Sequence, residues 1–210
     1  MKLKKKVKRT LIIIVILLIL IASGVGALIH FKTPKKKEVP EVKIVNEVDK
    51  YDYKLKENKP STYKKMFDEL KKILKEEPVD EEAYAKKVTE MFIYDFYSLN
   101  DKAAKTDIGG VDFIYKGVLD NFLLNAQDTY YKYVESNIYN ERKQSLPVVS
   151  NITINSIEKG EFAYGDQTDP AAYVVNVSWT YTDDEFASYQ KQAVVILIHD
   201  DIKLSIVELQ

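Results

Sequence analysis

The sequence contains no cysteine and only a few glycine, proline, histidine and tryptophan residues. Its 210 residues include no Cys, 7 Gly, 6 Pro, 2 His and 1 Trp. The lack of cysteine excludes disulfide scaffolds, thiolate zinc sites, iron–sulfur clusters, thiol catalysis and a lipidated N-terminal cysteine. A chain of this length can bury one sizeable core, and its hydrophobic fraction of 46% is ordinary for a globular protein.

The formal net charge is only −1 at pH 7, so the total shows no excess of one sign. The charges are nevertheless divided along the chain. Segment 1–37 holds ten of the 31 basic residues and no acid, which leaves 21 basic residues against all 32 acids in 38–210. The body of the protein is therefore acidic and would repel a phosphate backbone, so we expect no nucleic-acid partner.

The longest apolar run is LIIIVILLILIASGVGALIHF at residues 11–31. As a helix it would extend about 30 Å, the thickness of the hydrocarbon core of a bilayer. The basic residues that flank it are Lys4, Lys5, Lys6, Lys8, Arg9, Lys35, Lys36 and Lys37. This pattern predicts a transmembrane helix at 11–31, a cytoplasmic tail at 1–10 in contact with anionic lipid, and an extracytoplasmic body. A cleaved signal peptide and a secreted protein remain the alternative, because small residues lie within 22–27.

Segment 32–60 is charged, includes three of the prolines and lacks a sustained hydrophobic period. We expect a stalk that separates the domain from the membrane. Its valines and isoleucine are too numerous for a fully solvated tether, so part of the stalk is expected to dock on the domain as a strand or a helix.

Residues 61–210 are predicted to form one exported α+β domain, with helices in 61–140 and a sheet in 148–209. Apolar residues recur at helical spacing in the following segments: 62–76, 81–98, 111–125 and about 128–139. Asp80 is the expected N-cap of the second helix. After Pro147 the hydrophobic period changes to two, as in half-buried strands. Segment 193–198 is apolar on both faces, which predicts a central strand, and Asp200-Asp201 predicts the turn of a terminal hairpin.

Motifs for catalysis and for metal or cofactor binding are missing from the sequence. The two histidines, His30 and His199, do not form a metal-binding pair, and no Gly-x-Ser-x-Gly motif occurs. Segment 107–110, Asp-Ile-Gly-Gly, could present amides to an anion, but the Lys-Ser/Thr of a phosphate loop does not follow it. We expect a sharp turn capped by Asp107, and no catalytic residue, metal or cofactor.

Tyrosine is abundant, with 15 Tyr against 8 Phe. Two explanations remain open: an AT-rich coding sequence, or a binding face that uses the apolar ring and polar tip of tyrosine. Three aromatic residues of one predicted strand are candidates for a pocket or the core: Tyr173, Trp179 and Tyr181.

The order of elements is a short basic tail, one span, a stalk, helices and then an antiparallel sheet at about 152–209. This order resembles the bitopic subunits of conjugation and type IV secretion machines, whose exported domain is a nuclear-transport-factor-like cone of helices on a curved antiparallel sheet. The resemblance implies a non-catalytic assembly subunit of the bacterial cell envelope that contacts other envelope proteins or itself. The acidic body departs from the family pattern.

Two classes of function follow. A non-catalytic interaction protein should have a filled or shallow pocket and an exposed apolar or Tyr-rich surface. A small-ligand binder or enzyme on the same cone should have a deep cavity lined by Trp179, Tyr173 or Tyr181. An empty cavity above about 300 Å³ that also contains a desolvated Asp or Glu would argue against the first class.

Overall fold

The computed structural model describes residues 42–210, which belong to one compact unit, Glu41–Gln210. The predicted cytoplasmic tail, the predicted transmembrane helix and the first part of the predicted stalk lie outside the described residues. Across 42–210, no helix is both long and apolar enough to cross a membrane.

A four-stranded antiparallel sheet forms one layer of the domain, in the order β3-β4-β5-β6. Its strands are β3 (Val149–Tyr164), β4 (Gln167–Tyr181), β5 (Gln192–Asp200) and β6 (Lys203–Leu209). The predicted central strand is confirmed, since β5 lies between β4 and β6 and most of its side chains are buried. The predicted terminal hairpin is confirmed as well, with Asp201 in the left-handed region (φ 59°) between β5 and β6.

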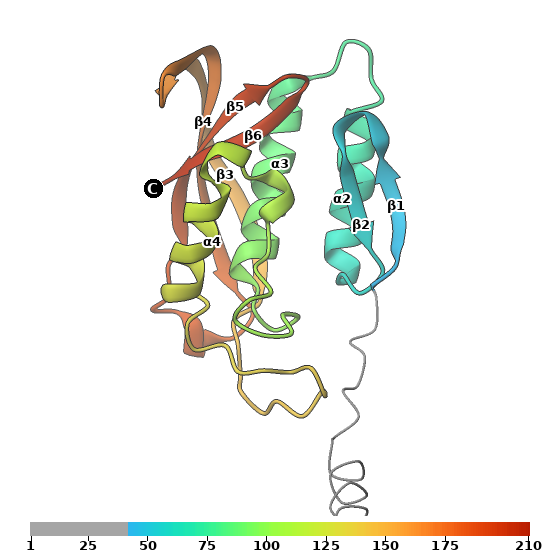
Figure 1. Cartoon of the computed structure of the whole chain (residues 1–210), viewed down its shortest axis with the longest axis vertical. Helices are drawn as coiled ribbons and strands as arrows, with labels where there is room; N and C mark the ends of the chain where they lie inside the picture. Colours follow the sequence, from blue (N-terminus) through green and yellow to red (C-terminus); the bar gives the residue numbers. More distant parts are fainter. Residues whose placement is uncertain (1–41) are drawn as a thin grey trace, which may run out of the picture. The chain divides into compact units, whose positions relative to one another are not determined.

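Within residues 42–210, three α-helices accompany this sheet, so the predicted α+β class is confirmed. They are α2 (Ser61–Ile73), α3 (Glu81–Tyr97) and α4 (Leu119–Asp128). The carboxylate of Asp80 accepts a hydrogen bond from the Ala83 amide at 3.0 Å and caps α3, as expected. Helix α3 lies between the sheet and α2 (Figure 1), and for this reason it is buried on nearly every side.

The predicted helix at 111–125 is divided in the structure. Two short 3₁₀ turns, η2 (Val111–Phe113) and η3 (Lys116–Val118), precede α4. Between these turns the Tyr115 amide donates to the Ile206 carbonyl at 2.8 Å. The chain is therefore held in an extended form along the edge of β6, and a continuous helix cannot form there.

The predicted helix at about 128–139 is wrong, because turns occupy this segment. Thr129 leaves the helical region (φ −118°, ψ −94°), and its hydroxyl donates to the Asn125 carbonyl at 2.6 Å. Such bonds between a side chain and the backbone compete with the helical pattern. Tyr131 and Val134 are buried as the spacing suggested, although turns bring them to the core.

The outer part of the segment predicted as a stalk is folded. Strands β1 (Ile44–Val48) and β2 (Tyr53–Lys56) form an antiparallel hairpin through η1 (Asp49–Tyr51). Tyr51, Tyr53 and Leu55 are buried in the core. The expected docking as a strand thus takes the form of a hairpin, but Val42, Ile44 and Val45, whose number suggested it, are exposed.

Candidate functional site

The three aromatic residues singled out from the sequence lie in or beside the core. Tyr173 and Trp179 are 4% and 3% exposed, and neither lines a cleft found within residues 42–210. Tyr181 is half-buried, and its hydroxyl donates to the Gln190 carbonyl at 2.8 Å. The deep cavity that the ligand-binding class predicts around these residues does not coincide with the clefts described below. The basic residues that flank the apolar run lie outside the described residues.

Many of the tyrosines instead build an aromatic cluster between α3, α4 and the sheet. The rings of Tyr97 and Trp179 lie 4.3 Å apart, and those of Phe96 and Tyr97 lie 4.9 Å apart in an edge-on arrangement. Tyr130 packs on both Phe96 and Tyr97. Such pairs contribute about 0.5–1.5 kcal/mol each beyond the area they bury. Core packing therefore accounts for part of the tyrosine content.

One side of this cluster opens into a cleft of about 420 Å³, which we call the aromatic groove. Its floor is formed by Phe96, Tyr97, Phe122 and Tyr130, which come from α3, α4 and the turn after α4. The remaining lining includes polar residues of α4 and of the turn after it, one residue of the loop before β5, and the last residues of β6: Asn121, Asn125, Thr129, Gln190, Val207, Glu208 and Leu209. Phe96 and Tyr97 are buried, and Phe122 and Tyr130 are half-buried. The cleft exceeds the volume of about 300 Å³ set above, but Glu208, the acid of its lining, is exposed, so the groove does not meet the test against the interaction class.

Sequence reasoning missed the polar residues of this groove. Asn121 and Asn125 lie four residues apart on α4, so their amides share one face of the helix. The only signal available was this spacing within a helix expected to be amphipathic. Nothing in the sequence placed that face beside β6, because the contact depends on how the helix docks on the sheet.

A second cleft of about 430 Å³ lies beside the β5–β6 turn, and we call it the charged cleft. Its lining includes Asp112 and Lys203. The surrounding protein raises the pKa of Asp112, yet its side chain remains exposed to solvent. The volume of the charged cleft exceeds the limit of about 300 Å³ set above. The test also requires a carboxyl group removed from water, and the Asp112 carboxyl group is removed only in part. The charged cleft thus has the volume that the ligand-binding class predicts, but not the buried carboxyl group.

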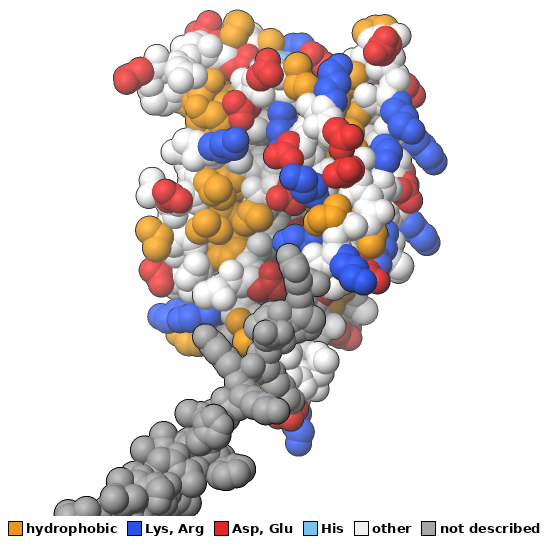
Figure 2. All heavy atoms as spheres, turned by 45° about the vertical axis from the view of Figure 1, so that its right-hand side comes forward, with side chains coloured by type: hydrophobic (Ala, Val, Ile, Leu, Met, Phe, Trp, Pro, Cys, Tyr) orange, Lys and Arg blue, Asp and Glu red, His pale blue; other side chains and the backbone are white. Residues whose placement is uncertain are grey.

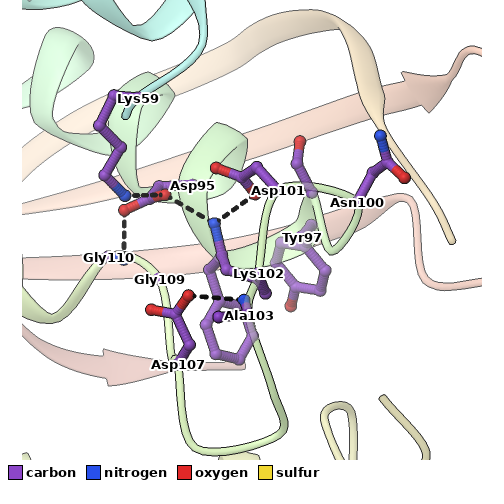
Figure 3. A network of polar contacts seen from close by, with 12 residues as sticks. Lys59, Asp95, Tyr97, Asn100, Asp101, Lys102, Ala103, Asp107, Gly109 and Gly110 are labelled. Carbon is purple, nitrogen blue, oxygen red and sulfur yellow. Dashed lines mark hydrogen bonds and ion pairs between the residues drawn. The ribbon is translucent and has the colours of Figure 1, made fainter. Parts of the chain in front are cut away.

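Segment 107–110, the two-glycine loop, does present an amide to an anion, and the anion is a side chain of the protein itself (Figure 3). The Gly110 amide donates to Oδ2 of Asp95 at 2.8 Å. Lys59 and Lys102 donate to Oδ1 of the same carboxylate at 2.5 Å and 2.9 Å. Asp107 does act as a cap, as expected, but it caps the turn before the two glycines. Its carboxylate accepts a hydrogen bond from the Ala103 amide at 2.8 Å. The loop is therefore a structural clamp on α3.

The charges in this network are buried, since Asp95 is 5% exposed and Lys102 is 2% exposed. Burial by itself would raise the pKa of Asp95, but the ammonium groups of Lys102 and Lys59 outweigh burial and hold this pKa at about 2. Asp101 also accepts from Lys102 at 2.7 Å. Every charge in the network has a partner, so it is suited to holding the loop and helix together rather than to binding a ligand.

A second polar cluster joins β4, β5 and the start of α3. The Asp169 carboxylate accepts from the His199 amide at 2.7 Å and lies 2.8 Å from Nδ1 of the same residue. Nε2 of His199 lies 3.6 Å from the Glu81 carboxylate, which also accepts from Tyr173 at 3.1 Å. A histidine held by a buried carboxylate is one part of many hydrolytic sites. Within residues 42–210, however, no serine or threonine hydroxyl bonds to this histidine, and no group of three or more metal-binding side chains is found.

Replacement of Asp169 by asparagine is expected to lower the free energy of unfolding by about 1–3 kcal/mol at pH 7, because the carboxylate accepts both backbone and side-chain hydrogen bonds. Burial would raise the pKa of Asp169, but these hydrogen bonds outweigh it and lower the pKa. The carboxylate therefore stabilises the fold above its unfolded pKa, about 3.9, and this contribution is lost as pH falls further. Urea denaturation at several pH values measures both effects. The control is Asp166→Asn at the exposed β3–β4 turn, which should change little.

The face of the domain drawn in Figure 2 has acidic and basic side chains interspersed, with hydrophobic patches between them. This face offers no continuous basic surface of the kind that holds nucleic acid. Comparison with known protein families, with curated proteins and with solved structures found no match to this chain.

Proposed function

We propose that this protein is a single-pass, membrane-anchored interaction protein whose domain works outside the cytoplasm by binding a partner. The observation that carries the proposal is the aromatic groove, where aromatic rings and polar side chains line a cleft of about 420 Å³. The anchor rests on the uncharged apolar run at 11–31 and its basic flanks.

The order of elements along the chain suggests the kind of complex in which this protein would act. A basic tail, an apolar run and an α+β domain are shared with the bitopic subunits of conjugation and type IV secretion machines. We carry over from this resemblance the nuclear-transport-factor-like cone and a non-catalytic role in assembling an envelope complex.

Capture of the full-length protein from its native membrane tests the proposal. We expect a second envelope protein, or further copies of this chain, to co-purify after mild detergent extraction. A protein that emerges alone and monomeric under these conditions would refute an assembly role. Protease treatment of intact cells tests topology at the same time, because an extracytoplasmic domain is digested and a cytoplasmic one is protected. Release of the domain into the medium would indicate signal-peptide cleavage.

A small-ligand binder or an enzyme is the second candidate, and the charged cleft favours it. Burial lowers the pKa of Lys203, whose ammonium lies 4.2 Å from the centre of the Tyr53 ring. Opposite charges in a cleft of about 430 Å³ could receive a small polar molecule. Screening metabolites by thermal shift separates the two candidates, since a ligand of the charged cleft should lose its effect in Lys203→Met while partner capture is retained.

A further inference from the structure

The outer edge of β6 is closed residue by residue along its first half. Successive residues of a strand direct their backbone groups to opposite sides, so every second residue of an edge strand faces away from the sheet. The Leu204 amide donates to the Tyr84 hydroxyl at 3.2 Å, and the Tyr53 hydroxyl donates to the Leu204 carbonyl at 3.5 Å. The Ile206 carbonyl accepts from the Tyr115 amide at 2.8 Å. Edge strands that lack such cover readily pair with another chain.

The same edge is open at its end, beside the aromatic groove. Gln210 exchanges two backbone hydrogen bonds with Val194, at 2.9 Å and 3.0 Å, so Gln210 faces β5. Its neighbour Leu209 therefore directs its amide and carbonyl away from β5. Within residues 42–210, no hydrogen bond from another element reaches these two groups. Leu209 also lines the aromatic groove.

The opposite wall of the groove carries two further free hydrogen-bonding groups. Asn121 and Asn125 are exposed, and neither side-chain amide bonds to any described residue. Each amide can both donate and accept. A chain lying between α4 and β6 would thus meet backbone-type hydrogen-bond partners on both sides and aromatic rings beneath it.

We propose that the aromatic groove binds an extended peptide segment of a partner protein, which adds to the free end of β6 as a short further strand. This inference rests on the proposed interaction function and names its partner chemistry. The floor of Phe96, Phe122 and Tyr130 calls for apolar side chains at alternate positions of the segment. Glu208 is the charged residue of the lining and calls for a lysine or arginine between them.

Charge also argues against a second copy of this chain as the occupant. Pairing of two β6 strands would bring two Glu208 carboxylates close together, and like charges near each other across a strand pair are unfavourable. Aromatic rings with Asn and Glu also suit sugars, but a free strand edge gives no particular advantage to a sugar. Self-association and sugar binding are therefore outcomes that the test must distinguish.

The test measures binding of a labelled hexapeptide, acetyl-Val-Lys-Leu-Lys-Val-Lys-amide, to the full chain in detergent by fluorescence anisotropy. We expect saturable binding with a Kd below about 1 mM. The first variant is Leu209→Pro, which removes the outward amide and leaves the bonds of Gln210 to β5 intact. The second is Asn121→Ala combined with Asn125→Ala, which leaves the sheet untouched. Each should weaken binding about tenfold.

Three controls accompany these variants. Leu124→Ala changes an exposed residue of α4 that does not line the groove, and it should bind as the original chain does. A peptide with N-methyl groups on alternate residues cannot pair as a strand, and a peptide with glutamate in place of lysine should be repelled by Glu208. Both peptides should bind at least about tenfold more weakly.

The inference is overturned if the original chain does not bind the hexapeptide, if the N-methylated peptide binds equally well, or if neither variant weakens binding. A dimer that Leu209→Pro dissociates, or an oligosaccharide that competes for the groove and is insensitive to that variant, would also overturn it. Capture of partners from the native membrane distinguishes failure of the peptide site from failure of the proposed interaction function. A partner retained equally by the original chain and by both variants would leave the interaction function standing and remove the peptide site.

Discussion

Replacement of Gly109 by alanine is expected to destabilise the domain by about 3 kcal/mol or more, among the largest effects that a single methyl group can have. A Cβ atom at this position would lie 2.0 Å from the carbonyl oxygen of Asp95 and 2.5 Å from its carbonyl carbon. Both atoms belong to the backbone of α3, so rotation of a side chain cannot relieve the overlap. The two-glycine loop would have to separate from the helix, with loss of the hydrogen bond from the Gly109 amide to the Tyr131 hydroxyl.

Thermal unfolding of the two glycine variants measures this effect. For a domain of this size, a loss of 3 kcal/mol corresponds to a fall in Tm of about 6–12 °C. Gly160→Ala in β3 is the matched control, because a Cβ atom there meets no atom within 4 Å. We expect Gly160→Ala to change stability by less than about 0.5 kcal/mol. Equal Tm values for the two variants would contradict the tight approach of loop and helix.

Replacement of Asp95 by asparagine is expected to cost about 3 kcal/mol, since it leaves the buried ammonium of Lys102 without its main partner. Asp101 remains within 2.7 Å of this ammonium and limits the loss. The double variant Asp95→Asn, Lys102→Met removes both charges, so we expect it to recover part of the stability. Chemical denaturation of the single and double variants measures this coupling. A double variant whose loss of stability equals the sum of the two single losses would show that the two charges do not stabilise each other.

Because Asp95 is ionised in the folded domain, we expect the stability of the domain to depend on pH in the acid range. Because the pKa of Asp95 is about 2 in the folded domain and about 3.9 in an unfolded chain, the ionised group contributes about 2 kcal/mol of stability above pH 4. This contribution is lost as pH falls from about 4 to about 2. The acid limb of a stability–pH curve should therefore become shallower in Asp95→Asn. An unchanged acid limb would show that other carboxylates control acid unfolding.

The elements that the sequence predicted correctly are those whose burial follows a local period. Strand β4 was predicted because its apolar residues alternate over Tyr173–Tyr181, and the start of α3 was predicted because Asp80 precedes a helical stripe. The segment after α4 was predicted wrongly for the same reason. Tyr131 and Val134 have helical spacing, but the Tyr131 hydroxyl donates to the Phe96 carbonyl at 2.7 Å and holds the segment in turns.

The candidate site could not be derived in this way, because its parts meet only through tertiary packing. Phe122 and Leu209 belong to distant segments, and the groove exists because α4 docks beside the end of β6. The network at Asp95 is similar, since a glycine amide from a loop and lysines from two segments converge on one carboxylate. The sequence showed two glycines and an aspartate in the loop, but it could not show that the anion would come from a neighbouring helix.

The tyrosine hydroxyls that close the first half of the β6 edge have a consequence for the order in which the protein can be completed. Tyr53 and Tyr84 contact the backbone of Leu204, which follows them by 151 and 120 residues. Contacts over such sequence separations form late, because the loop between them must close first. Tyr53 and Tyr84 can therefore reach these partners only after Leu204 has been synthesised and β6 has paired with β5.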